Sequence, residues 1–188
     1  MTFETIISIC LGVGLSASVG FRVFLPLFAL SLAAYFDVWQ LNETWEWIGS
    51  TAALITLGVA TIVEICAYFI PYIDNLLDSI AIPLAALAGT AIMLSTVADL
   101  SPVITWALAI IAGGGTAAAV AGTSGTTRLA STATTGGLAN PLVSILETGT
   151  SVVMSVISIF LPILAAVLVI IILFVIFKLY KKFKFQNQ

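Results

Sequence analysis

The sequence predicts an all-α membrane protein with about six transmembrane segments, arranged as two inverted three-helix repeats with broken or re-entrant segments. Composition is the first observation, because 61% of the 188 residues are hydrophobic and only 8% are charged. A soluble domain is about 45–50% apolar and about 25% charged, so lipid must surround most of this chain. The second observation is that most uncharged runs could cross a hydrocarbon core, which takes about 20 helical residues. They lack the short alternating pattern of barrel strands.

Six segments can be drawn from these runs. They cover residues 6–36, 48–70, 80–97, 102–120, 141–160 and 162–180. Only Pro162 separates the last two, with no polar residue to mark a turn, so one kinked helix is the alternative there. The first residues carry no positive charge of the kind a signal peptide has, so we expect the first apolar run to be retained.

Basic and aromatic residues predict the orientation. Four lysines follow the last segment, and the positive-inside rule places that tail in the cytoplasm. With six crossings, both termini are then cytoplasmic. The four tryptophans fall near the opposite interface, where amphipathic rings prefer to lie. These lysines and tryptophans are Lys178, Lys181, Lys182, Lys184, Trp39, Trp45, Trp47 and Trp106.

Two glycine-rich stretches are the third observation. Residues 6–36 would make a helix about 46 Å long at about 1.5 Å per residue, too long for a plain crossing. Glycine and proline concentrate at 12–26 within it, which indicates a break or a re-entrant hairpin. A similar stretch at 113–128 also leads to a glycine and then an arginine. The repeats would therefore be residues 1–99 and residues 100–188, the second ending in the basic tail, and an odd number of crossings in each makes them inverted.

Two arginines in these stretches are the first candidate binding residues. Arg22 lies within an apolar segment, where a charge costs about 2.5–3.5 kcal/mol on insertion scales. Guanidinium groups match phosphate and carboxylate, so Arg22 and Arg128 suit an anionic group. A structural ion pair with an intramembrane carboxylate such as Glu64 is the equal alternative for Arg22. Because their contexts match, we expect the two arginines to converge in space.

The acidic residues offer two kinds of chemistry. Glu64 and Glu147 could balance the arginines or carry a coupling proton. Asp74 and Asp78 lie four positions apart beside Asn75, and oxygen ligands of this kind could coordinate a hard cation. Acidic residues that simply begin a helix are the plainer interpretation of that pair.

The segment 123–141 is rich in Gly, Ser and Thr but contains a single charge. Its hydroxyl and amide groups, including Asn140, could line a re-entrant loop that desolvates an ion or head group. A flexible linker is the alternative.

Several classes of function are disfavoured. The chain has no histidine, no nucleophile–base constellation and no glycine-rich loop with a Walker lysine, so we expect neither an enzyme nor a bound cofactor. There is no basic patch for nucleic acid. Cys10 and Cys66 lie in apolar runs without metal or redox spacing.

Three motifs resemble those of a family of small bacterial inner-membrane proteins catalogued as a domain of unknown function. They are GFRVFLP at 20–26, EICAYFIPYIDNLLD at 64–78 and RLASTATTGGLANP at 128–141. The resemblance covers most of the chain and supplies no activity. It implies a multi-pass protein of the bacterial inner membrane and one shared site, formed by Arg22, Glu64, Asp74, Asn75, Asp78, Arg128 and Asn140.

The expected function is a small secondary transporter or channel for an anionic solute or lipid head group, with proton coupling. The expected site consists of Arg22, Arg128, Glu64, Asn140 and Glu147. One alternative is a cation-binding or cation-conducting protein that uses Asp74, Asn75, Asp78 and Glu64. Another is a non-transporting scaffold or assembly partner, because spacings such as Gly12–Ser16–Gly20 also suit plain helix packing. The partners are the lipid bilayer and the anionic group, and a homodimer is reasonable at this size.

Overall fold

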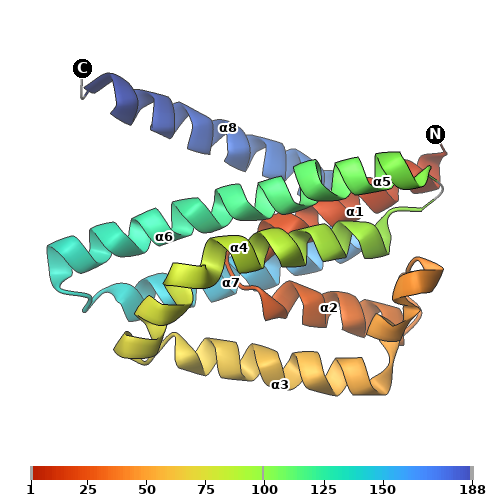
Figure 1. Cartoon of the computed structure of the whole chain (residues 1–188), viewed down its shortest axis with the longest axis horizontal. Helices are drawn as coiled ribbons and strands as arrows, with labels where there is room; N and C mark the ends of the chain where they lie inside the picture. The colour runs from red at the N-terminus through yellow and green to blue at the C-terminus, as the bar shows by residue number, and fades with distance from the viewer. Residues whose placement is uncertain (1, 99, 187–188) are drawn as a thin grey trace.

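The computed structural model describes residues 2–98 and 100–186, and these are helical, with no strand among them. The all-α prediction is therefore confirmed. The long helices lie roughly along one axis, while the last one diverges from the others (Figure 1). In chain order the elements are α1 Phe3–Val19, α2 Phe24–Tyr35, the 3-10 helix η1 Glu43–Gly49, α3 Thr51–Ala67, α4 Pro71–Thr96, α5 Pro102–Leu108, the π-helix η2 Ala109–Gly114, α6 Gly115–Thr135, α7 Asn140–Phe160 and α8 Pro162–Gln186.

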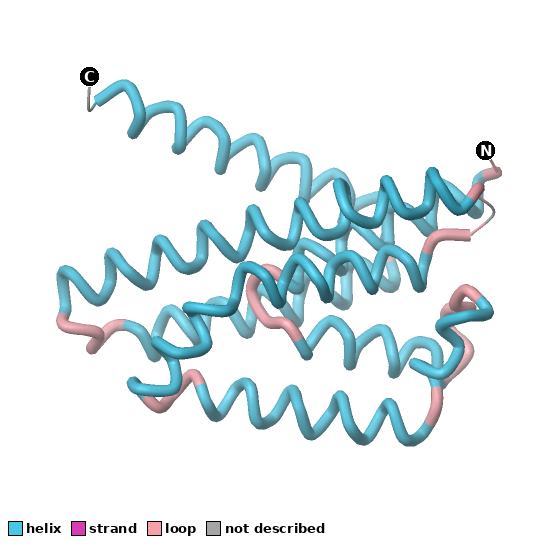
Figure 2. Tube along the Cα trace, in the orientation of Figure 1, coloured by secondary structure: helices cyan, strands magenta, loops and turns pink. Residues whose placement is uncertain are grey.

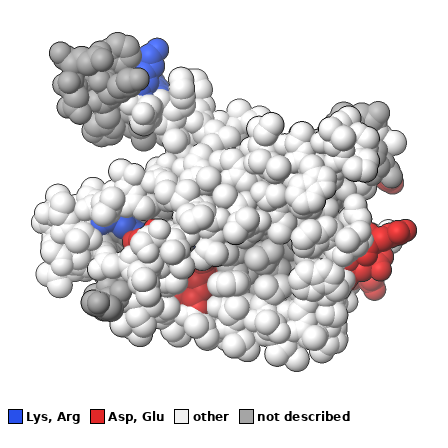
Figure 3. Space-filling view, viewed as in Figure 1, with Lys and Arg blue, Asp and Glu red and all other residues white. Residues whose placement is uncertain are grey.

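The face of the bundle seen in Figure 3 is largely uncharged, and charge gathers at a few places on it. Large hydrophobic side chains such as Val103, Ile111 and Leu146 are 70–80% exposed. Three helices, Ile73–Thr96, Pro102–Thr135 and Asn140–Phe160, are long and apolar enough to cross a membrane, or four if η1 and α3, bent by 63°, form one span. Together these features indicate a membrane-embedded protein, although the count of six spans is not reached on this criterion.

The predicted break in the first segment is present. Residues 20–23 separate α1 from α2 and form the turn at the centre of Figure 2. The chain reverses there, so α1 and α2 pack against each other as a hairpin, and α2 returns to the end of the bundle where α1 begins (Figure 1).

The re-entrant loop expected at 123–141 does not form. Pro102–Thr135 is a continuous helical stretch interrupted only by the π-turn η2, and the turn is limited to residues 136–139. Hydroxyl groups in α6 donate to carbonyls one turn earlier, so a Ser/Thr-rich sequence satisfies its polar groups inside a helix. Gly136 ends α6 at φ 64°, in the left-handed region that favours glycine.

The segment around Pro162 is two helices rather than one kinked helix. Leu161, with φ −137° and ψ 62°, separates α7 from α8. The two helices run in opposite directions (Figure 1). The proline lies at the first position of α8, where its missing N–H costs nothing.

Small residues let the central helices approach closely. A Cβ added at Gly113 in η2 would lie 2.5 Å from the carbonyl oxygen of Gly89 in α4. Ser16 of α1 donates to that same Gly89 oxygen at 3.0 Å. A Cβ at Gly20 would lie 2.4 Å from the side chain of Val120 in α6. The Gly12–Ser16–Gly20 stripe therefore packs α1 against α4 and α6, as the packing interpretation of that spacing predicts.

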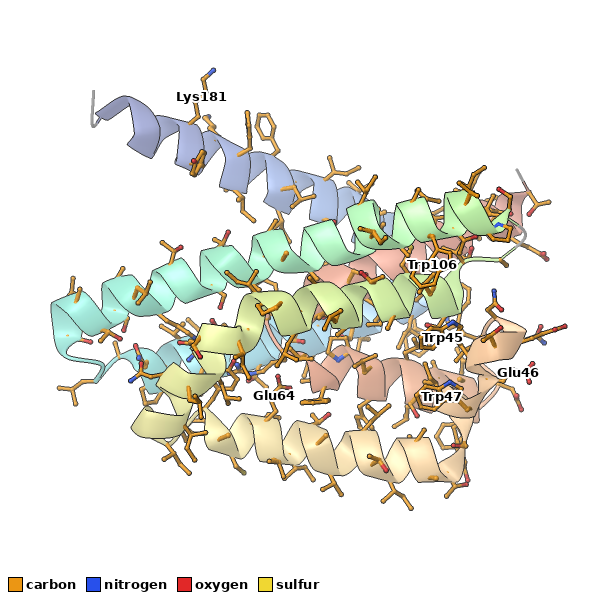
Figure 4. All side chains as sticks on the ribbon, in the orientation of Figure 1. Trp45, Glu46, Trp47, Glu64, Trp106 and Lys181 are labelled. Atoms are coloured by element: carbon orange, nitrogen blue, oxygen red, sulfur yellow. The ribbon has the colours of Figure 1, made fainter. Side chains whose placement is uncertain are left out.

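The two ends of the described chain lie at opposite ends of the bundle. The tryptophans Trp45, Trp47 and Trp106 lie at the end where α1 begins, while Lys181 lies at the other (Figure 4). Six crossings would bring the two termini to one side, but the α1–α2 hairpin adds no net crossing. The placement of both termini in the cytoplasm stays a prediction. The arrangement of the helices, with the two ends of the chain at opposite ends of the bundle, does not support it.

The close contact at Gly113 predicts a specific loss of stability. Gly113→Ala should lower the melting temperature in detergent, because the new methyl group meets backbone and overpacking costs about 1–3 kcal/mol. Gly125→Ala is the matched control on α6, where nothing lies within 4 Å of the added Cβ. That control should keep or slightly raise the melting temperature, since alanine favours a helix by about 0.5–1 kcal/mol. Equal melting temperatures for the two variants would contradict the packing.

The hairpin predicts how single cysteines react in whole cells. In a variant without Cys10 and Cys66, cysteines at the exposed positions Glu4 and Asn42 should react with an impermeant label from the same side. A cysteine at Lys181 should react from the other side. If α1 and α2 formed one crossing, Glu4→Cys would instead share the side of Lys181→Cys.

Candidate functional site

Two buried arginines mark the candidate site. Arg22 lies in the break between α1 and α2, and Arg128 lies on α6. Only 1% of Arg22 and 2% of Arg128 is exposed. A buried guanidinium needs partners for its charge and its five N–H donors, so the contacts of these two side chains define the site.

Arg128 is held by three carboxylates. Its Nε donates to both carboxylate oxygens of Glu147, each at 3.1 Å. Its two Nη groups bind Glu147 and Asp74, and Asp78 Oδ1 lies 3.7 Å from Nε. The carboxylates come from α4 and α7, so this one side chain ties α4, α6 and α7 together.

Arg22, in the break between α1 and α2, contacts the same Glu147 carboxylate as Arg128. Its Nη1 lies 3.4 Å from Glu147 Oε2, the oxygen that Arg128 also contacts. Its Nε donates to Thr148 Oγ1 at 2.9 Å, and Nη2 donates to the Ser144 carbonyl at 3.0 Å. The expected convergence of Arg22 and Arg128 is therefore present, and Glu147 is the bridge.

Tyr68 forms an aromatic contact to both arginines. The guanidinium carbon lies 3.9 Å from the ring centroid for Arg22 and 4.4 Å for Arg128. Cations are attracted to the face of an aromatic ring at such distances. Sequence reasoning missed this residue as part of the site. Tyr68 could have been identified by its sequence position, because it lies one helical turn after Glu64 and a few residues before Asp74 and Asp78.

Glu64 has a different role from the expected ion pair with Arg22. Its carboxylate accepts the backbone N–H groups of Val23 at 2.7 Å and Phe24 at 3.0 Å. Val23 caps α2 without a side-chain hydrogen bond of its own, so Glu64 supplies the cap from α3. Glu64 therefore fixes the break that presents Arg22.

Asn140 and Asn75 lie at the edge of the cluster. Asn140 Nδ2 donates to Asp74 Oδ2 at 3.3 Å and to Thr132 Oγ1 at 3.1 Å. Its Oδ1 is buried without a hydrogen-bond partner among the described residues. Asn75 lines a cavity of about 160 Å³ together with Asp74 and Asn140.

The expected cation ligands contact an arginine. Asp74 and Asp78 both contact Arg128, which occupies the place a bound cation would take between them. Within residues 2–98 and 100–186, no three His, Cys, Asp or Glu side chains converge as a metal site. The two aspartates therefore serve the arginine cluster in this structure.

The charge balance of the cluster is uneven. In the ion pairs of the cluster, two guanidinium groups face the three carboxylates of Asp74, Asp78 and Glu147, which leaves one formal negative charge. Glu64 is not among these pairs, because its carboxylate binds backbone N–H groups next to Arg22. The Asp78 side chain is 23% exposed, against 2% for Asp74 and 7% for Glu147.

The fold and site define a class of protein: a helical membrane protein with an arginine–carboxylate cluster built around a broken helix. A family model described as domain of unknown function DUF4126 matches residues 9–182, so the chain belongs to this family. The suspected family resemblance is confirmed in that respect. No curated protein and no solved structure matches the chain in the two other comparisons.

Proposed function

We propose that this protein is a small secondary transporter or channel for an anionic solute or lipid head group, coupled to protons. The observation that carries the proposal is the position of Glu147, whose carboxylate bridges Arg22 and Arg128 inside the bundle. A carboxylate that neutralises two arginines occupies the place an incoming anion would need. Arginine binds phosphate and carboxylate with the same donors, so one anion can replace the other.

Protonation of Glu147 couples the two events. The resting cluster is neutral when one proton is bound among its three carboxylates. A further proton on Glu147 weakens its hold on both guanidinium groups and leaves the cluster one charge positive. An anion then restores neutrality, which matters because a net charge within a membrane protein costs several kcal/mol. Each negative charge on the ligand therefore enters with one proton.

The convergence of the two arginines and the membrane placement belong to the same proposal. Arg22 and Arg128 come from the two halves of the chain, 1–99 and 100–188, and meet at one place, as residues from the two halves of many transporters do. The tryptophan-bearing end faces the outside and the lysine-bearing end faces the cytoplasm of a bacterial inner membrane. The exposed apolar faces leave room for a homodimer in the bilayer.

A cation-handling function is the second candidate. It is favoured by the excess of carboxylates over arginines and by the partial exposure of Asp78. Arg128 already supplies positive charge to Asp74 and Asp78, which is why the anion is preferred.

Proton flux in liposomes tests the proposal. Purified protein is reconstituted around a pH-sensitive dye, and inorganic phosphate, glycerol phosphate or phosphatidylglycerol is added from outside. At least one of these probes should acidify the lumen faster than in protein-free liposomes. Glu147→Gln should abolish the acidification, because glutamine cannot take up the proton, while the exposed control Glu46→Gln should preserve it.

The arginine variants separate the candidate functions. Arg22→Gln and Arg128→Gln should reduce flux by more than their loss of folded protein explains, with Lys181→Gln as the control for lost charge. Flux driven by Na⁺ or Mg²⁺ that Asp78→Asn abolishes and Arg22→Gln spares would favour the cation function instead. Absence of flux with every probe would leave a scaffold or assembly role.

A further inference from the structure

A cleft at the surface of the bundle reaches Glu147, the carboxylate that bridges the two arginines. It lies between α6, α7 and α8, and its volume is about 430 Å³, within the range of about 300–1,000 Å³ typical of ligand sites. Helix α8 leaves the bundle at an angle and diverges from α6 toward its C-terminal end (Figure 1).

The cleft is mostly apolar, and its few polar groups lie on one side. Aliphatic side chains of α8 line one side, and they are Ile171, Ile172, Val175 and Ile176. The other side combines the apolar side chains of Phe21, Val120, Val143 and Leu146 with the hydroxyl-bearing residues Thr123, Ser124, Thr127 and Thr150. Glu147 also lines it, and Ser124 donates a hydrogen bond to that carboxylate. The only acidic group in the lining is thus the one that bridges the two arginines.

We propose that this cleft admits a membrane lipid with an anionic head group, its acyl chain against α8 and its head group at Arg22 and Arg128. This inference rests on the proposed function and names its substrate class. A lining with seven aliphatic residues and one phenylalanine does not stabilise a water-soluble anion, whereas it does bury an acyl chain. The charge of the arginine pair selects an anionic head group once Glu147 is protonated. Ser124, which donates to Glu147 in this structure, can donate to the head group when that group displaces the carboxylate.

The test is a lipid-flipping assay in proteoliposomes. Trace lipids with a fluorescent acyl chain are placed in both leaflets, and an impermeant reductant bleaches the outer one. Phosphatidylglycerol should flip faster than phosphatidylcholine and faster still when the outside is acidified. Ile171→Trp, which fills the cleft, should slow flipping about tenfold, a change that needs only ~1.4 kcal/mol at the barrier. Ile170→Trp is the matched control, because the neighbouring Ile170 is exposed and does not line the cleft.

The outcomes distinguish the two proposals. Proton-coupled movement of inorganic phosphate or glycerol phosphate without any lipid flipping would overturn the lipid inference and leave the proposed function standing. Equal flipping of phosphatidylglycerol and phosphatidylcholine, or equal effects of the two tryptophan variants, would also overturn it. Failure of lipid and soluble anions alike would overturn both proposals. Faster flipping of the anionic lipid, sensitive to Ile171→Trp only, would support both.

Discussion

The structure depends on one electrostatic constraint: Arg22 and Arg128 are buried in a bundle surrounded by lipid, and neither can remain unpaired there. Glu147 meets both side chains, and Asp74 and Asp78 complete the shell around Arg128. These contacts fix the relative positions of α4, α6, α7 and the α1–α2 break. Breaking such a buried pair by removing one partner typically costs about 3–5 kcal/mol, more than most single packing contacts. The cluster therefore organises the half of the bundle that holds it, while small residues close the other half.

The broken first segment connects this constraint to the backbone. A helix that starts inside a membrane leaves N–H groups that no water can satisfy. Glu64 accepts hydrogen bonds from two of them, at Val23 and Phe24, and so stabilises the break next to Arg22. The structure thus uses one acidic residue to hold the backbone open and another, Glu147, to hold the arginines.

The sequence predicted those features that are energetically unfavourable in a membrane and can be recognised from residue order alone. The cost of a buried charge marked Arg22, and the matching context marked Arg128, so their convergence could be anticipated. Excess length marked the break in residues 6–36. The re-entrant loop at 123–141 was wrong, because Ser and Thr can bond within a helix and their number alone does not distinguish helix from loop. Tyr68, Ser144 and Thr148 were missed because an uncharged side chain in a membrane segment is not unusual. Only the three-dimensional structure shows that these three contact the arginines.

The central claim is that three carboxylates share two arginines and that one proton among the three carboxylates balances the charge. Infrared spectroscopy of the protein in lipid tests it directly, because a protonated carboxyl absorbs apart from a carboxylate. The wild type should show a protonated carboxyl at neutral pH, and Glu147→Gln or Asp78→Asn should remove it, since two carboxylates then balance two arginines. The exposed control Glu46→Gln should retain it. A wild type without a protonated carboxyl, or a signal that only Glu64→Gln removes, would contradict the account.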